Sequence, residues 1–333
     1  MDKLWKQLVL AVTLGILVPQ MFFSVGEWFY PPENMVMPTD PMAPTTSLQE
    51  QAPPDDAVAV VYLPVVEKDG SVTVMQLEDY VRGVVLAEMP ATFEMDALKA
   101  QAIAARTYVL RRLISADKHR QGAVCTDYTC CQAYLTDAAY LETRGNQNGL
   151  AKIARAVWET AGLVITYEGD FIEATYFACS GGYTEDALAV WGEEIPYLQA
   201  VSSPGEKKGE VYNKEHFFTP AEFAACLGRD LAGSPKLWFG DVRTTPGGGV
   251  AYMVIGGITY SGVELRKLLG LNSTLFELRA DDKGILVRSR GWGHRVGMSQ
   301  YGADAMALSG SDYRQILAYY YPGTVIDKLS NVK

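Results

Sequence analysis

The 333-residue sequence is poor in positive charge and in cysteine. It has 29 Lys and Arg residues against 39 Asp and Glu, a net charge of −10, and no dense basic cluster. Proteins that bind nucleic acid gain most of their affinity from basic side chains on phosphates, so no nucleic-acid partner is expected. Five cysteines are too few to make a disulfide scaffold.

Motifs of several enzyme classes are also absent. The sequence has no G-x-x-x-x-G-K or G-x-G-x-x-G phosphate loop and no H-E-x-x-H zinc-hydrolase motif. The Ser180-Gly181-Gly182 segment lacks the G-x-S-x-G pattern of a serine hydrolase, so a turn that lines a cleft is the better interpretation. The 48% of apolar residues still suffices for one large or two ordinary globular domains.

The N-terminal segment predicts a membrane anchor. Lys3 and Lys6 precede a charge-free apolar run from Leu8 to Phe23, near the lower limit for a membrane span. We expect residues 1–29 to form a cytoplasmic stub and a transmembrane helix, with the rest of the chain outside the cytoplasm at the cell membrane. A cleavable signal peptide is the alternative, because Ser24-Val25-Gly26 offers small residues at the right spacing.

The remainder divides into a linker and a folded part. Residues 30–56 are rich in proline and predict an extended tether. Residues 57–333 predict one α+β domain. Hairpins are expected over 58–75 and 163–177, further strands at 250–254 and 284–288, and a helix of the 77–88 region ended by Pro90. More helices are expected over 95–115, 151–160, 261–269, 300–308 and 312–320, the third of these beginning with a capping box at Ser261.

Glu88 is the most informative single residue. At about 100° per residue it falls on the apolar stripe that Leu77, Val81 and Val84 form, so its carboxyl should project from the packed face. Burial disfavours the charged carboxylate and raises its pKa, which suits a general acid near neutral pH. The alternative is a structural Glu that turns to water or pairs with Arg82 or Arg106.

Two other groups of residues can carry chemistry. His119, Cys125, Cys130 and Cys131 offer up to four ligands for tetrahedral Zn²⁺, while a disulfide from Cys125 to one of the other two is equally compatible with the spacing. Gly291-Trp292-Gly293-His294, followed by Gln300 and Tyr301, has the composition of a sugar-binding cleft, although a tight turn with a satisfied His fits it as well.

The order of these segments is specific. From Tyr62 to Gly323 the chain resembles the stage II sporulation protein D family, which are peptidoglycan lytic transglycosylases of endospore-forming bacteria. The resemblance is carried by four segments: Leu77 to Pro90, Leu98 to Tyr108, Ser180 to Glu185 with Val190-Trp191-Gly192, and Gly291 to Ala303. Three departures are Cys130 where the zinc-binding relatives have His, Arg295 where Gly is usual, and Cys179 where Ser or Thr is usual.

The resemblance implies that residues 57–333 form a catalytic domain with a substrate groove, and it also implies a site, a reaction and partners. Glu88 would be the catalytic acid and base, and zinc would be held by His119, Cys125, Cys130 and Cys131 beside it. The groove would use Gln101, Arg106, Tyr176, Ser180, Gly181, Trp292, His294, Gln300 and Tyr301. The expected substrate is peptidoglycan glycan strands that lack stem peptides, cut between MurNAc and GlcNAc with a 1,6-anhydro end. Expected partners in engulfment are stage II sporulation proteins P, an amidase, and M, a membrane recruiter.

Two other functions stay open from the sequence. One is a non-catalytic scaffold that holds glycan strands in the same groove without cutting them. The other is a zinc amidase or peptidase, which would need an open coordination position on the metal for a water molecule. The sequence also leaves a homodimer open.

Overall fold

The computed structural model describes residues 28–29, 60–67, 69–115, 119, 123–206 and 212–332. The anchor and tether expected over 1–29 and 30–56 lie outside this range, apart from the backbone of a short strand β1 (Trp28–Phe29). Among the described residues, none of the helices combines the length and the apolar character that a membrane crossing requires.

The described elements confirm an α+β fold. Before residue 212 they are β2 (Tyr62–Val66), β3 (Val72–Gln76), α2 (Leu77–Glu88), α3 (Met95–Ser115), β4 (Val124–Cys125), α4 (Asp137–Arg144), α5 (Gln147–Glu159), β5 (Leu163–Tyr167), β6 (Asp170–Phe171), β7 (Tyr176–Phe177) and α6 (Ala187–Trp191). After it come β8 (Asn213–Phe218), α8 (Pro220–Cys226), η2 (Pro235–Leu237), β9 (Phe239–Thr244), β10 (Val250–Ile255), β11 (Ile258–Ser261), α9 (Gly262–Leu268), β12 (Phe276–Ala280) and β13 (Ile285–Arg290). The chain closes with β14 (Met298–Ser299), α10 (Gln300–Leu308), α11 (Tyr313–Tyr320), β15 (Val325–Lys328) and η3 (Leu329–Asn331).

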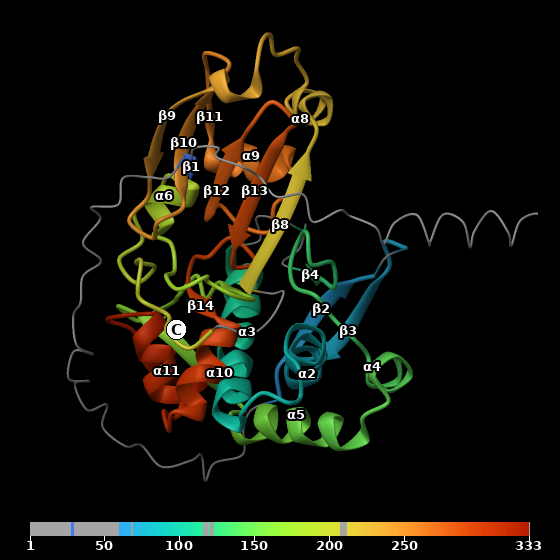
Figure 1. Cartoon of the computed structure of the whole chain (residues 1–333). Helices are drawn as coiled ribbons and strands as arrows, with labels where there is room; N and C mark the ends of the chain where they lie inside the picture. Colours follow the sequence, from blue (N-terminus) through green and yellow to red (C-terminus); the bar gives the residue numbers. More distant parts are fainter. Residues whose placement is uncertain are drawn as a thin grey trace, which may run out of the picture.

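The larger of two hydrophobic cores is built around α3. This helix is rich in alanine, and small side chains let α2, α5, α10 and α11 pack closely against it in the lower half of Figure 1. The buried residues of this core come from both ends of the folded part, since Val84 and Ile103 share it with Ile316 and Leu317. The N-terminal and C-terminal segments therefore stabilise each other.

A second core lies within residues 213–290, which form the upper part of Figure 1. Strands β12, β13 and β8 form one antiparallel sheet, and β11, β10 and β9 form another. Phe223, Met253 and Leu278 are buried between them. The two ends of this segment are neighbours, because Asn213 pairs with Arg290 across β8 and β13. The folded part expected as one domain thus has two separate cores.

Several sequence expectations are confirmed. Helix α3 has the predicted bounds, α10 and α11 match theirs within a residue, and Ser261 forms its capping box with Glu264. The first hairpin exists as β2 and β3.

Two expectations about local structure were wrong. The helix expected from residue 151 begins at Gln147, because Asn146 caps it through the Gly149 N–H, and the preceding helix α4 was not expected. In the second hairpin only Asp170 and Phe171 pair with β5. The next strand, β7, pairs in parallel with β14 from near the C-terminus.

Candidate active site

A cleft of about 1030 Å³ lies beside Glu88. Its walls come from α2, α3, the loop after β4, strand β7, helix α6 and the Gly293-His294 turn. The lining includes the aromatic residues Tyr108, Tyr128, Tyr176, Phe177, Trp191 and Tyr197. An acidic group and several aromatic rings thus share one cleft, a composition typical of a ligand-binding site.

Glu88 is the last residue of α2 and only partly exposed. The stripe that the sequence predicted is real, since Leu77, Val81 and Val84 are all buried. Burial raises the pKa of the Glu88 carboxyl, and hydrogen bonds from Gln300 and from the backbone of Ala133 only partly oppose that effect. The Gln300 amide nitrogen donates to Glu88 Oε2 at 3.1 Å.

The two arginines that could pair with Glu88 bind other acids. Arg82 pairs instead with Asp79 and Asp137, each at 3.0 Å. Arg106 pairs with Glu78 at 2.5 Å. Glu88 therefore lies in the cleft without a basic partner among its described contacts, as a group that gains or releases a proton would.

The loop after β4 connects the cysteines to Glu88. Gln132 directly follows Cys131, is almost fully buried, and donates from its amide nitrogen to the Tyr176 hydroxyl at 2.7 Å. The next residue, Ala133, donates its N–H to Glu88. Burial and then the Glu88 charge raise the pKa of Tyr176, so this phenol lies within electrostatic reach of the acid.

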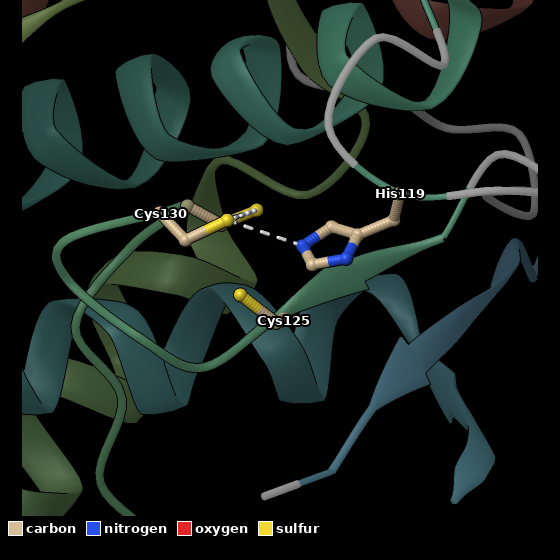
Figure 2. Close-up of side chains that lie close together, drawn as sticks. His119, Cys125 and Cys130 are labelled. Atoms are coloured by element: carbon tan, nitrogen blue, oxygen red, sulfur yellow. Dashed lines mark hydrogen bonds between the residues drawn. The ribbon is translucent and has the colours of Figure 1, made fainter. Parts of the chain in front are cut away.

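His119, Cys125, Cys130 and Cys131 converge as the sequence predicted. Their ligand atoms all lie within 4.8 Å of one another. Figure 2 shows the side chains of His119, Cys125 and Cys130 turned toward a common point. Cys130 Sγ is 3.2 Å from His119 Nε2 and 4.0 Å from Cys131 Sγ.

These residues fit a tetrahedral metal ion. With Zn–S near ~2.3 Å and Zn–N near ~2.0 Å, tetrahedral ligands lie about 3.5 to 3.8 Å apart. The observed spacing needs only small side-chain adjustments to reach those values. Among the described residues, no disulfide joins Cys125 to Cys130 or Cys131.

Two residues expected in the groove are buried in the core instead. Gln101 and Arg106 are both fully buried on α3. The Arg106 guanidinium binds Glu78 and donates to the backbone carbonyl of Leu163 at 3.0 Å. These contacts join α3 to α2 and β5, so the expectation that Arg106 contacts substrate is corrected to a structural role. Neither residue lines the cleft.

The Ser180-Gly181 turn also has a structural role. The Ser180 hydroxyl and N–H and the Gly181 N–H all donate to Glu206 Oε2 at 2.8 to 3.0 Å. Ser180 is fully buried and does not line the cleft, so the expected contact with substrate is corrected here too.

Only some residues of the segment from Gly291 to Tyr301 line the cleft. His294 and Gly293 line the cleft, whereas Trp292, which is 48% exposed, and Tyr301, whose ring packs on Phe93, do not. Burial lowers the pKa of His294 to about 4, so its ring is neutral near pH 7. Its neighbours are the rings of Trp191 and Phe177, at centroid distances of 5.6 and 5.7 Å.

The contacts of Arg295 explain why arginine is accepted at a position where glycine is usual. Its φ of 68° is a left-handed conformation that favours glycine. The guanidinium is fully buried, binds Glu185 at 2.9 Å, and donates to the carbonyls of Ser180, Tyr183 and Gly247 at 2.7 to 2.8 Å. Gly247 belongs to the turn between β9 and β10. Arg295 therefore joins this turn to the segment that contains Ser180 and Tyr183.

Sequence reasoning missed several residues of the cleft. Gln132 could have been found because it adjoins the cysteine cluster. Tyr128 had a weaker signal because it lies in an irregular loop. Trp191 belongs to Val190-Trp191-Gly192, one of the segments that carry the family resemblance, but it was not assigned to the groove. Only the folded chain places them beside Glu88.

Comparison with known proteins identifies close relatives. A family model described as Stage II sporulation protein matches residues 67–167. Stage II sporulation protein D of Bacillus subtilis (strain 168) is 45% identical over 78% of this chain and 76% of its own length. The protein of the same name from Bacillus amyloliquefaciens is 42% identical over the same shares. A protein named Amidase enhancer from Bacillus subtilis (strain 168) is 28% identical over 74% of this chain and 40% of its own length.

Proposed function

The chain belongs to the stage II sporulation protein D family, a family of sporulation proteins, and we propose that it is a peptidoglycan lytic transglycosylase. Its substrate is the glycan strand of septal peptidoglycan during engulfment, cut between MurNAc and GlcNAc. The observation that carries the proposal is Glu88, a carboxyl with a raised pKa in a cleft lined by aromatic rings.

One carboxyl group is enough for this reaction. Protonated Glu88 donates its proton to the glycosidic oxygen as the bond from that oxygen to MurNAc C1 breaks. The resulting carboxylate then takes the proton of the MurNAc C6 hydroxyl as that oxygen bonds to C1, which closes the 1,6-anhydro ring and restores the acid. No water is consumed, so the second carboxylate of ordinary glycosidases is not needed. Glu173, another acid in the cleft, is held by Arg111 and Arg112.

The residues around Glu88 support both of its protonation states. Burial favours the protonated acid that begins the reaction. The Gln300 amide and the Ala133 N–H can stabilise the carboxylate that forms after the first proton transfer. The acid is therefore neither permanently ionised nor permanently neutral.

We propose that His119, Cys125, Cys130 and Cys131 hold Zn²⁺ as a structural ion. Four protein ligands leave no coordination position for a reactive water, and a bound ion would supply cross-linking of the loop. That loop carries Gln132 toward Tyr176 and Ala133 toward Glu88, so its order bears directly on the acid. A zinc amidase or peptidase would instead require an open position on the metal.

A glycan-binding scaffold is the second candidate. One relative carries the name Amidase enhancer, which describes a supporting role for that protein. Such a scaffold would use the same cleft but would have no need of an acid with a raised pKa.

The proposal includes a working context. We propose that the chain acts at the cell membrane with its catalytic domain outside the cytoplasm. Its substrate would be strands from which the amidase, stage II sporulation protein P, has removed stem peptides, with stage II sporulation protein M as the membrane recruiter.

The test is to incubate the protein and its Glu88→Gln variant with peptide-free glycan strands and to analyse the products by mass spectrometry. We expect ends about 18 Da lighter than hydrolysed ends, absent with the variant. Reducing ends would show hydrolysis and refute the transglycosylase. Intact strands that still bind would favour the scaffold.

A further inference from the structure

Two large aromatic side chains in the cleft are exposed. Tyr128 is 78% exposed and Trp191 is 43% exposed, and both line the cleft that contains Glu88. They come from separate parts of the chain, the loop after β4 and the end of α6. Exposed aromatic surface inside a cleft is typical of a binding site, because contact with a ligand removes it from water.

Tyr128 is held by a tight turn tied to the cysteine cluster. The Asp127 carboxylate accepts hydrogen bonds from the Thr129 N–H at 2.8 Å and from the Thr129 hydroxyl at 2.7 Å. The Asp127 carbonyl accepts from the N–H groups of Cys130 and Cys131 at 3.0 and 2.8 Å. The backbone on both sides of Tyr128 is therefore fixed, while its ring extends into the cleft.

The Trp191 side chain is held by neighbouring rings. It is the last residue of α6, and Gly192 in the left-handed conformation ends the helix there. Its indole contacts the ring of His294, which in turn contacts Phe177. Because His294 is neutral, these three rings form an uncharged cluster, and Trp191 is its most exposed large aromatic side chain in the cleft lining.

We propose that Tyr128 and Trp191 are two stacking platforms for the sugar rings of the glycan strand. The apolar C–H face of a β-linked aminosugar packs on an aromatic ring, whereas its hydroxyl and acetamido groups remain free for polar partners. The Trp191 ring is held by its contact with His294 and the backbone beside Tyr128 is fixed by the Asp127 hydrogen bonds, which reduces the conformational entropy lost when a strand binds. This inference rests on the proposed function, since it takes the glycan as the ligand.

The chain provides matched controls. Trp158 is 79% exposed and Tyr62 is 58% exposed, and neither lines this cleft. If exposed aromatic residues bound glycan without regard to position, Trp158→Ala and Tyr62→Ala would weaken binding as much as substitutions in the cleft. If position in the cleft determines glycan binding, these two control variants bind glycan with the affinity of the parent protein.

Binding should be measured by calorimetry with peptide-free glycan oligosaccharides on the full chain carrying Glu88→Gln, which prevents cleavage. We expect Tyr128→Ala and Trp191→Ala each to weaken binding about five- to tenfold, a typical contribution of one aromatic contact. Tyr128→Phe and Trp191→Phe keep a ring and should retain most of the affinity. With active enzyme the alanine variants should raise KM and leave kcat nearly unchanged.

Three results would overturn the proposal: parental affinity in both alanine variants, equal losses in the Trp158→Ala control, or a fall in kcat at constant KM. Failure of the proposed function gives a different pattern. Strands would then bind in a way that depends on Tyr128 and Trp191 but would never be cut by the protein with Glu88 intact.

Discussion

Replacing Arg295 with glycine should destabilise the protein although it relieves backbone strain. A left-handed φ costs a residue other than glycine roughly 1 to 2 kcal/mol, which Arg295→Gly recovers. The same change leaves Glu185 buried without its cation, which costs about 3 to 5 kcal/mol. Three carbonyls also lose their donor. We expect a net loss of roughly 2 to 3 kcal/mol in the free energy of unfolding.

Thermal unfolding measures this loss. At about 2 to 4 °C per kcal/mol for a folded part of this size, Tm should fall by roughly 4 to 12 °C. The control is the double variant Arg295→Gly with Glu185→Gln, which removes the unpaired charge and should recover part of the loss. Parental stability in Arg295→Gly, or a deeper loss in the double variant, would refute the reasoning.

Four further outcomes follow from the site. Glu88→Gln should abolish cleavage yet leave Tm at pH 7 equal or higher, because the buried carboxylate is replaced by a neutral group; a clear fall in Tm would contradict this. Cleavage by the unmodified enzyme should decline as pH rises through the raised pKa of Glu88, with a midpoint above that of an ordinary Glu; a rate that climbs with pH across that range would argue against an acid. Elemental analysis should find one zinc ion per chain, lost in Cys125→Ser, and circular dichroism after chelation should show a lower Tm; a metal-free native protein would exclude the ion. The pKa of His294 lies below its value in the unfolded chain, so the folded state binds fewer protons, and stability should fall as pH drops from about 6.5 to 4; His294→Phe should reduce that dependence in pH-titrated unfolding.

Features governed by local spacing were predictable from the sequence. The apolar stripe of α2 predicts that Glu88 projects from the packed face, and the short spacing of Cys125, Cys130 and Cys131 predicts their convergence. Both depend on segments in which neighbours in sequence are neighbours in space. For such segments the helical period and the loop length determine the geometry.

Features governed by distant contacts were not predictable. Whether Arg106 serves the groove or the core depends on Glu78, which lies on a different helix. The Ser180-Gly181 turn owes its role to Glu206, and no pattern within either segment indicates that partner. Trp292 and Trp191 both adjoin glycine in the sequence, but only the packing of α6 on His294 decides which of them lines the cleft.

The paired ends of the second core have a consequence for changes in the length of its loops. Because Asn213 and Arg290 are paired neighbours, residues 213–290 leave and re-enter the rest of the protein at one place. A change in the length of the loops within this segment therefore leaves its two attachment points together. The contacts of Arg295 with Gly247 and of Glu185 with Thr245 limit which changes the segment can accept, because they join its β9–β10 turn to the rest of the protein.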